Sequence, residues 1–298
     1  MNTASKKRLS AFFTNDATGL IFAAALLVSS ITAKAQWTLY ASDTITKQLF
    51  TLDKTTAGST LVGNYGVDGT MGGLAYDPNH DVLFGSDTTT NSLYQINRAT
   101  GAATLVGSFG SFGLTPAYFQ ALAFDSMTNK LYGAYGTTAN PMLYQINPTT
   151  GAATAIGSPG YTISGLSFNP VTHVLYGSNA QNGGIYALNP ATGSVISQVS
   201  TLGFNGLSFD PVTATLYGVS NGGTVSTGGL AKGLYTINLQ DGTAQLVGGL
   251  SLSNPLDIQF VRSVPEPSTT MLLAAAFTWL AGIPAARKFH RRRLPDRS

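Results

Sequence analysis

The sequence predicts an all-β protein, a five-bladed β-propeller of four-stranded antiparallel blades, preceded by a signal helix and followed by a transmembrane helix. Three observations predict the propeller: a repeat of 41 to 48 residues, alternating apolar residues within each copy, and complementary partial copies at the two ends of the repeat region. Repeats of this length built from short strands are typical of propeller blades. The expected domains are residues 1–35, 36–263 and 264–298.

The repeat is recognised by an apolar pentapeptide that opens each copy. It reads GLAYD, ALAFD, GLSFN and GLSFD and begins at residues 73, 121, 165 and 206, so its spacing is 48, 44 and 41 residues. Within the copy at 165–198 the apolar residues alternate in short runs separated by turn residues. A period of two predicts strands.

Two turn positions recur along the complete and partial copies. An Asp or Asn ends the first strand, as Asp77, Asp125, Asn169 and Asp210, and another ends the third strand, as Asp53, Asn97, Asn147, Asn189 and Asn238. We expect these side chains to accept hydrogen bonds from their own turns, and the glycine after most third strands to adopt the left-handed conformation.

The ends of the repeat region complete each other. Residues 37–63 supply the second, third and fourth strands of a blade, and residues 255–261 supply the missing first strand. Joining them makes a fifth blade and closes the ring without an exposed sheet edge. An open solenoid or a two-sheet sandwich is the alternative.

The LYG and LYxIN segments of these copies resemble blades of the β-propeller superfamily found in bacterial surface proteins. The resemblance covers residues 37–262. It implies a fold and no particular activity.

The first 35 residues have the three parts of an export signal. Lys6, Lys7 and Arg8 precede the apolar run 20–28, and a small-residue site follows at Ala33 and Ala35. This order predicts a secretory signal cleaved after Ala35. A retained membrane anchor is the alternative, although nine apolar residues fall short of a span.

Composition narrows the functional classes. Charged residues make up 10% of the chain and cysteine is absent, so disulfides, cysteine-ligated zinc and thiol nucleophiles are excluded. Residues 36–263 hold six Lys and Arg against ten Asp, a net charge of −4. A region with net negative charge lacks the basic surface that binds nucleic acid, so no nucleic-acid partner is expected.

The titratable residues do not form a recognisable catalytic, metal or cofactor motif, and we expect no enzyme, metal or cofactor. Glu266 is the only glutamate and lies outside the repeats, whereas glycoside hydrolysis normally needs two carboxylates. A glycan hydrolase or lyase using Asp at the channel mouth is the alternative. The Asp residues not explained by turn positions are Asp43, Asp68, Asp81, Asp87 and Asp257. His80 and His173 fall in turns of non-adjacent blades and are expected to be exposed.

Aromatic residues in the loops between blades predict a ligand face. Tyr65, Phe119, Tyr161 and Phe204 follow fourth strands of successive copies. Exposed rings beside Asn and Thr suit stacking on sugars or contact with another protein. The alternative is that these rings fill the central channel or pack between blades.

The last 35 residues change composition abruptly. They begin with Val264, Pro265, Glu266, Pro267 and Ser268, continue as an apolar segment at 269–286, and end in a basic cluster of Arg287, Lys288, Arg291, Arg292 and Arg293. The apolar segment is long enough to span a membrane as a helix, and the basic cluster stays cytoplasmic by the positive-inside rule. The propeller is then expected outside the cytoplasm.

This ordered tail resembles the PEP-CTERM sorting signal, which is named for its Pro-Glu-Pro start. The match covers Pro265, Glu266 and Pro267, the apolar segment, and the basic end at 291–293. It implies recognition and cleavage by a membrane-embedded exosortase and delivery to the cell surface or the extracellular matrix. An ordinary membrane anchor is the alternative. The sequence thus predicts a non-enzymatic surface or biofilm-matrix protein that binds polysaccharide or protein, without naming the ligand.

Overall fold

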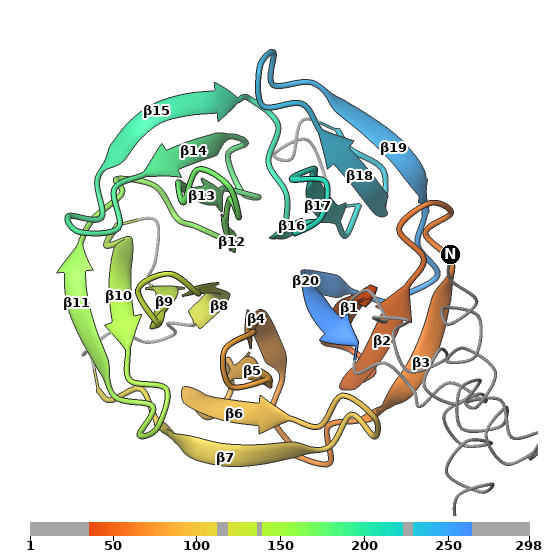
Figure 1. Ribbon diagram of the computed structural model, residues 1–298, viewed down its shortest axis with the longest axis vertical. Coiled ribbons are helices and arrows are strands. Elements are labelled where there is room, and N and C mark those ends of the chain that lie inside the picture. Colours follow the sequence, from red (N-terminus) through yellow and green to blue (C-terminus); the bar gives the residue numbers. More distant parts are fainter. Residues whose placement is uncertain (1–35, 112–118, 136–138, 223–228, 264–298) are drawn as a thin grey trace, which may run out of the picture. The chain divides into compact units, whose positions relative to one another are not determined.

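The computed structural model describes residues 36–111, 119–135, 139–222 and 229–263. These residues form strands β1 to β20, arranged as five four-stranded antiparallel sheets around a common axis (Figure 1). Residues Trp37–Ser263 make one compact unit. The predicted all-β five-bladed propeller is confirmed.

Four blades are continuous in sequence and run from the axis outward. The first of them comprises β4 (Met71–Asp77), β5 (Val82–Asp87), β6 (Ser92–Ile96) and β7 (Ala103–Ser108). The second comprises β8 (Phe119–Asp125), β9 (Lys130–Tyr135), β10 (Met142–Ile146) and β11 (Ala153–Gly157). The third comprises β12 (Gly165–Phe168), β13 (Leu175–Ser178), β14 (Ile185–Leu188) and β15 (Val195–Ser200). The fourth comprises β16 (Gly206–Phe209), β17 (Leu216–Ser220), β18 (Gly233–Ile237) and β19 (Ala244–Gly249).

The fifth blade joins the two ends of the repeat region. Its order is β20 (Pro255–Ser263), β1 (Gln36–Asp43), β2 (Gln48–Leu52) and β3 (Ser59–Asn64). The predicted closure is therefore confirmed, and the open solenoid and the sandwich are excluded. The innermost strands β4, β8, β12, β16 and β20 surround the axis, each in contact with the next (Figure 1).

The recurring Asp and Asn residues bond their own turns as expected. At the end of β12, the Oδ1 of Asn169 accepts hydrogen bonds from the N–H groups of Val171 (2.9 Å) and Thr172 (3.0 Å). The equivalent Asp210 accepts from Val212 N–H at 2.9 Å. These bonds satisfy backbone N–H groups of the turn, which have no partner in the β-sheet. The same turn also places a non-glycine residue in the left-handed region in four blades, as Asp81, Asn129, His173 and Ala214.

The core lies in the seams between blades. One hydrophobic cluster of described residues occupies each seam and draws side chains from the two neighbouring sheets. The tyrosine of the LYG segment meets an aromatic residue of the next inner strand. The ring centroids are 5.4 Å apart for Tyr132 and Phe168, 5.5 Å for Tyr176 and Phe209, and 5.4 Å for Tyr217 and Phe260. Contacts at this separation favour edge-on or tilted aromatic pairs, which lock the blades together.

The predicted signal helix and the predicted helix at 269–286 lie outside the described residues. Within the described ranges, no helix has the length and apolar character needed to cross a membrane.

Candidate functional site

Three of the four aromatic residues expected on a ligand face are in the core. Tyr65, Phe119 and Phe204 are fully buried at 0% exposure, so the expectation that they present their rings to a ligand is wrong. Phe119 packs 4.8 Å from the ring of Tyr135, and Phe204 packs 5.6 Å from the ring of Tyr235. They follow the alternative of packing between blades, in the seam clusters, because a ring of small sheets needs bulky side chains to fill its seams.

Tyr161 is the member of this set that reaches the surface. It is 43% exposed and stacks on Tyr186 with ring centroids 4.4 Å apart and an interplanar angle of 10°. A partly exposed stacked ring can still contact a sugar or a protein, and its role in binding stays a prediction.

The Asp residues left unexplained by turn positions are used by the fold. Asp43 and Asp87 are fully buried, and both bind backbone N–H groups. Asp43 accepts from Ile45 (3.0 Å) and Ser253 (2.6 Å), and Asp87 accepts from Thr70 (3.0 Å). Carboxylates held by several N–H donors are turn and loop anchors, because buried backbone donors need partners.

Asp257 lies on β20 among the inner strands and is also fully buried. Its Oδ2 accepts from Leu74 N–H of β4 at 2.7 Å, and its Oδ1 accepts from Ile258 N–H at 2.9 Å. Burial raises the pKa of Asp257 well above its ordinary value, although backbone bonds from Leu74, Ile258 and Leu207 oppose that rise. One carboxyl group therefore ties β20 to β4 on one side and to β16 on the other.

The two remaining Asp residues, Asp81 and Asp68, make separate contacts. Asp81 receives hydrogen bonds from Arg98 (2.6 Å) and Tyr76, and is 40% exposed. The backbone carbonyl of Asp68 accepts a hydrogen bond from Lys47. Nothing in these contacts brings the two carboxyl groups to a shared site.

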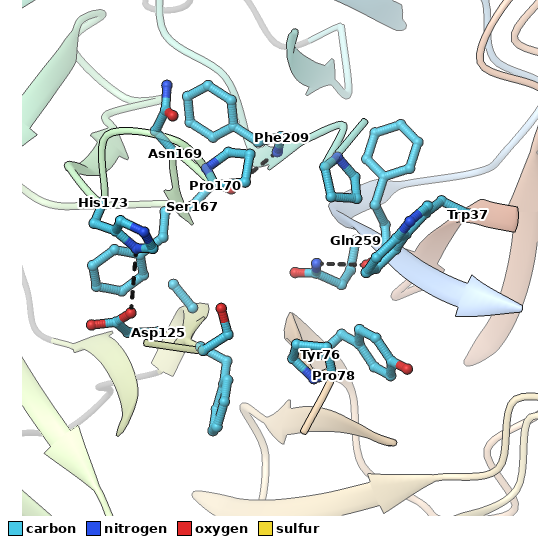
Figure 2. A pocket seen from close by; sticks show the side chains of 16 residues that line it. Trp37, Tyr76, Pro78, Asp125, Ser167, Asn169, Pro170, His173, Phe209 and Gln259 are labelled. Atoms are coloured by element: carbon cyan, nitrogen blue, oxygen red, sulfur yellow. Dashed lines mark hydrogen bonds and ion pairs between the residues drawn. The ribbon is translucent and has the colours of Figure 1, made fainter. Parts of the chain in front are cut away.

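A cavity of about 240 Å³ lies where the inner strands end in their Asp or Asn turns (Figure 2). We call it the axial cavity, because all five blades contribute to its wall. Its lining residues are Trp37, Tyr76, Pro78, Ala123, Phe124, Asp125, Ser126, Ser167, Phe168, Asn169, Pro170, His173, Phe209, Pro211, Gln259 and Phe260. Loops such as the one carrying Tyr161 lead into the opposite ends of the inner strands, so the cavity is not on the face that we expected to bind the ligand.

The axial cavity contains one carboxylate beside an imidazole. His173 Nδ1 lies 3.9 Å from Asp125 Oδ1, across the seam between the blades of β8 and β12 (Figure 2). Asp125 also accepts from Met127 N–H (3.0 Å) and Thr128 Oγ1 (2.6 Å), which hold it in place. This pair offers a carboxylate acceptor and an imidazole ring at the edge of the cavity.

Sequence reasoning missed the position of His173 in the wall of the axial cavity. Its side chain is 31% exposed and the residue is half-buried, so the expectation of an exposed turn residue is wrong for His173. His80 is 63% exposed, as expected, and bonds Asp77 within its own turn. The available sequence signal was its place in the turn before β13, in phase with Asp81, Asn129 and Ala214 of the other blades. Recognising it required knowing which side chain of the neighbouring blade faces that turn.

Metal ligation can be judged for the described residues, whereas the terminal motifs lie outside them. Among the described residues, no group of three or more His, Cys, Asp or Glu could hold a metal ion. The cleavage residues Ala33 and Ala35, the sorting residues Val264, Pro265, Glu266, Pro267 and Ser268, and the basic residues Arg287, Lys288, Arg291, Arg292 and Arg293 lie outside the described ranges.

The profile of a family described as "Repeat of unknown function (DUF6923)" matches residues 37–202. The chain belongs to the DUF6923 family. The match covers strands β1 to β3 of the closing blade and the three complete blades after them, so DUF6923 repeats are propeller blades in this protein. No curated protein sequence matches the chain.

Solved structures share the fold of this DUF6923 protein at low sequence identity. A chain of a nidogen/laminin complex matches with a TM-score of 0.52 at 15% identity, covering 76% of this chain and 98% of that one. A protein of unknown function from Bacteroides thetaiotaomicron matches with a TM-score of 0.51 at 18% identity, covering 76% and 65%. A gluconolactonase from Xanthomonas campestris reaches a TM-score of only 0.46 at 14% identity, which is too low to bear on function.

Proposed function

We propose that this DUF6923 protein is an exported, non-enzymatic propeller that binds a sugar unit of an extracellular polysaccharide in the axial cavity. The observation that carries the proposal is the composition of the cavity wall. Aromatic residues such as Trp37 and Phe168 lie there beside Asp125, His173 and Gln259, the combination that suits the apolar faces and hydroxyl edges of a sugar.

The size and polarity of the cavity support a small neutral ligand. Sites for drug-sized molecules usually occupy about 300–1,000 Å³, and the axial cavity at about 240 Å³ suits a single sugar ring. Gln259 Nε2 donates to Phe260 O at 2.9 Å, so its Oε1 can accept from a ligand hydroxyl.

Export and sorting rest on the terminal sequences. The basic and apolar segments before Ala35 are those of a secretory signal, and the segment from Pro265 to Arg293 resembles a PEP-CTERM tail read by exosortase. Delivery to the cell surface or matrix would place the axial cavity where polysaccharide is found. The tail would act as an address and Glu266 would take no part in chemistry.

The second candidate is a glycan hydrolase or lyase, which the Asp125 and His173 pair favours. It is less well supported, because glycoside hydrolysis normally uses two carboxylates and Asp125 is the only carboxylate among the described residues of the cavity wall.

One experiment separates the two candidates. Glycan-array binding of the full chain identifies a bound polysaccharide, and chain-length analysis of that polysaccharide after incubation measures turnover. The same measurements are made on Asp125→Asn. We expect binding without turnover in both proteins. Turnover by the native protein that Asp125→Asn abolishes would establish the enzyme, and a blank array would remove the carbohydrate ligand.

A further inference from the structure

Strand β20 aligns with the other inner strands through a shared hydrogen bond. Phe209 N–H of β16 donates to Ser167 Oγ of β12 at 3.1 Å. Phe260 N–H of β20 donates to Ser208 Oγ of β16 at 2.9 Å in the same way. Phe260 therefore corresponds to Phe209, the fourth residue of its pentapeptide, and the pentapeptide of β20 is residues 257–261.

The wall of the axial cavity begins at the third residue of these pentapeptides. Ala123, Ser167 and Gln259 are third residues that line it, and Figure 2 shows Gln259 reaching into the cavity from β20. The wall continues through fourth and fifth residues to the turns, where Pro170 and Pro211 are half-buried. Of the described residues, no first or second residue of a pentapeptide belongs to the wall.

The first two residues of the five pentapeptides close the other end of the axis. All of them are buried, and those other than glycine are at most 1% exposed. They are Gly73, Leu74, Ala121, Leu122, Gly165, Leu166, Gly206, Leu207, Asp257 and Ile258.

Neighbouring inner strands touch backbone to backbone at this level. A Cβ added to Gly165 would lie 2.8 Å from Gly206 Cα, and one added to Gly206 would lie 2.5 Å from Asp257 Cα. On the other side of β20, Leu74 N–H donates to Asp257 Oδ2 at 2.7 Å. A buried floor packed this closely leaves no passage for a sugar, so the axial cavity is open only at its turn end.

The turn end of the cavity faces solvent. Ser126 of the wall is exposed there, and three apolar residues of the same turns stand further out. Met127, Val171 and Val212 are 66%, 72% and 71% exposed and are not part of the wall. We call these three residues the rim. A ligand must enter and leave the cavity past the rim.

A cavity with one opening distinguishes the units of a polysaccharide. An internal unit is linked to its neighbours through two of its oxygens, so both neighbours would have to turn back through the same mouth. The cavity of about 240 Å³ has room for one ring and none for two returning chains. A terminal unit has one link, which can point to the rim while its free hydroxyls meet Asp125 and Gln259.

We propose that the axial cavity binds the terminal sugar unit of a polysaccharide end-on and excludes internal units. Specificity then comes from a steric barrier against internal units as well as from contacts to the end of the chain. This inference rests on the proposed function and deepens it, because it names the part of the polysaccharide that is recognised.

Titration of the native protein with linear chains of one sugar tests end-on binding. The ligands are the methyl glycosides of glucose, galactose, mannose and N-acetylglucosamine, and the linear oligosaccharides of each sugar from the disaccharide to the hexasaccharide. We expect the affinity per chain to stay within about twofold from the disaccharide upward, because only the last unit is held. For a linear polysaccharide of the same sugar, cutting a given mass to half its mean chain length should double the protein bound at saturation.

The number of chain ends and the mass of polysaccharide give opposite expectations. Saturation that follows mass, or affinity that climbs with every added unit, would overturn end-on binding. Borohydride reduction opens the sugar ring at the reducing end alone, so it tells the two ends apart. Binding retained after reduction assigns the non-reducing end and binding lost assigns the reducing end, and both results support end-on recognition.

A pair of variants locates the sugar in the cavity. Gln259→Phe fills the floor, and we expect it to weaken binding of every ligand at least about tenfold. Val171→Phe is the matched control, because it adds the same ring at the rim, outside the wall, and should change affinity by less than about twofold. A chain lying across the mouth would give the reverse order, which would refute the proposal.

Thermal unfolding checks that both variants fold. If Gln259→Phe does not fold, the chain-length and chain-end measurements on the native protein decide the outcome by themselves.

Failure of the proposed function and failure of end-on binding give different results. If the native protein binds none of the glycosides and oligosaccharides, the proposed function fails and end-on binding fails with it. If the native protein binds a chain and saturation follows polysaccharide mass, the proposed function stands and only end-on recognition is refuted.

Discussion

Asp257 shows how one residue serves the closure of the ring. In the four complete copies, the position that corresponds to Asp257 holds a small residue: Gly73, Ala121, Gly165 or Gly206. A Cβ added to Gly206 would lie only 2.3 Å from Asp257 Oδ1, so the carboxyl group occupies the space that the glycine leaves. An acidic residue is present at this buried point because it satisfies backbone donors of two neighbouring inner strands.

We expect Asp257→Ala to lower the free energy of unfolding by about 3 kcal/mol, because the N–H groups of Leu74, Ile258 and Leu207 lose their acceptor. The pH dependence has a defined sign. A carboxyl whose folded pKa is raised binds its proton more tightly in the folded state, so stability falls as pH rises from the ordinary pKa toward the raised one.

Chemical denaturation from pH 3 upward measures both effects. The native protein should lose stability across that window, and the fall should be smaller in Asp257→Asn, which has no proton to release. An identical pH profile in the two proteins would contradict the protonation argument, whatever the cost of the substitution.

At the scale of the element, the outer rim of each seam depends on close backbone contact. A Cβ added to Gly107 at the end of β7 would lie 2.1 Å from the carbonyl oxygen of Thr150, in the turn after β10 of the next blade. The same approach recurs for Gly63 with Thr100 and for Gly157 with Thr192. In these three fourth strands, the glycine near the strand end is thus required by the turn of the neighbouring blade.

We expect Gly107→Ala to destabilise the protein by about 3 kcal/mol, because backbone atoms cannot move aside as a side chain can. Gly66→Ala is the comparison: Gly66 has φ of 71° but nothing within 4 Å of an added Cβ, so only the left-handed strain of about 1 kcal/mol applies. Thermal unfolding of both variants checks the order. A smaller loss for Gly107→Ala than for Gly66→Ala would contradict the seam argument.

At the scale of the whole molecule, closure of the propeller ring and the proposed sorting of the chain depend on different segments. The pairing of β20 with β1 joins residues far apart in sequence, and Lys54 reaches across the adjoining seam to Asp210. Burial alone would raise the pKa of Asp210, but the hydrogen bonds from Lys54, Val212 and Thr213 hold it below its ordinary value. The ends of the repeat region are therefore tied by both backbone pairing and charge.

The proposed sorting route is tested in the native host. Changing Arg291, Arg292 and Arg293 together to Ala removes the basic end, which the positive-inside rule requires for orientation. We expect accumulation of unprocessed chain in the membrane, with at least a severalfold loss of the surface or released form on immunoblots of cell fractions. A Lys288→Ala variant controls for loss of a single charge. Normal release from the triple variant would refute the sorting assignment.

The sequence by itself determined the blade count, the strand order within a blade, the turn chemistry and the closing of the fifth blade by the two ends of the repeat region. Each of these follows from local patterning repeated in phase: alternation, an Asp or Asn at the strand end, and matching partial copies at 37–63 and 255–261. Such signals survive because a strand and its turn involve residues close together in the chain.

Only the tertiary structure decided where side chains from different blades meet. It buried Tyr65, Phe119 and Phe204 in the seams and placed His173 beside Asp125. These relations depend on the angle and depth at which neighbouring blades pack, which no single repeat encodes. The fold could therefore be predicted copy by copy, whereas the axial cavity exists only once all five inner strands surround the axis.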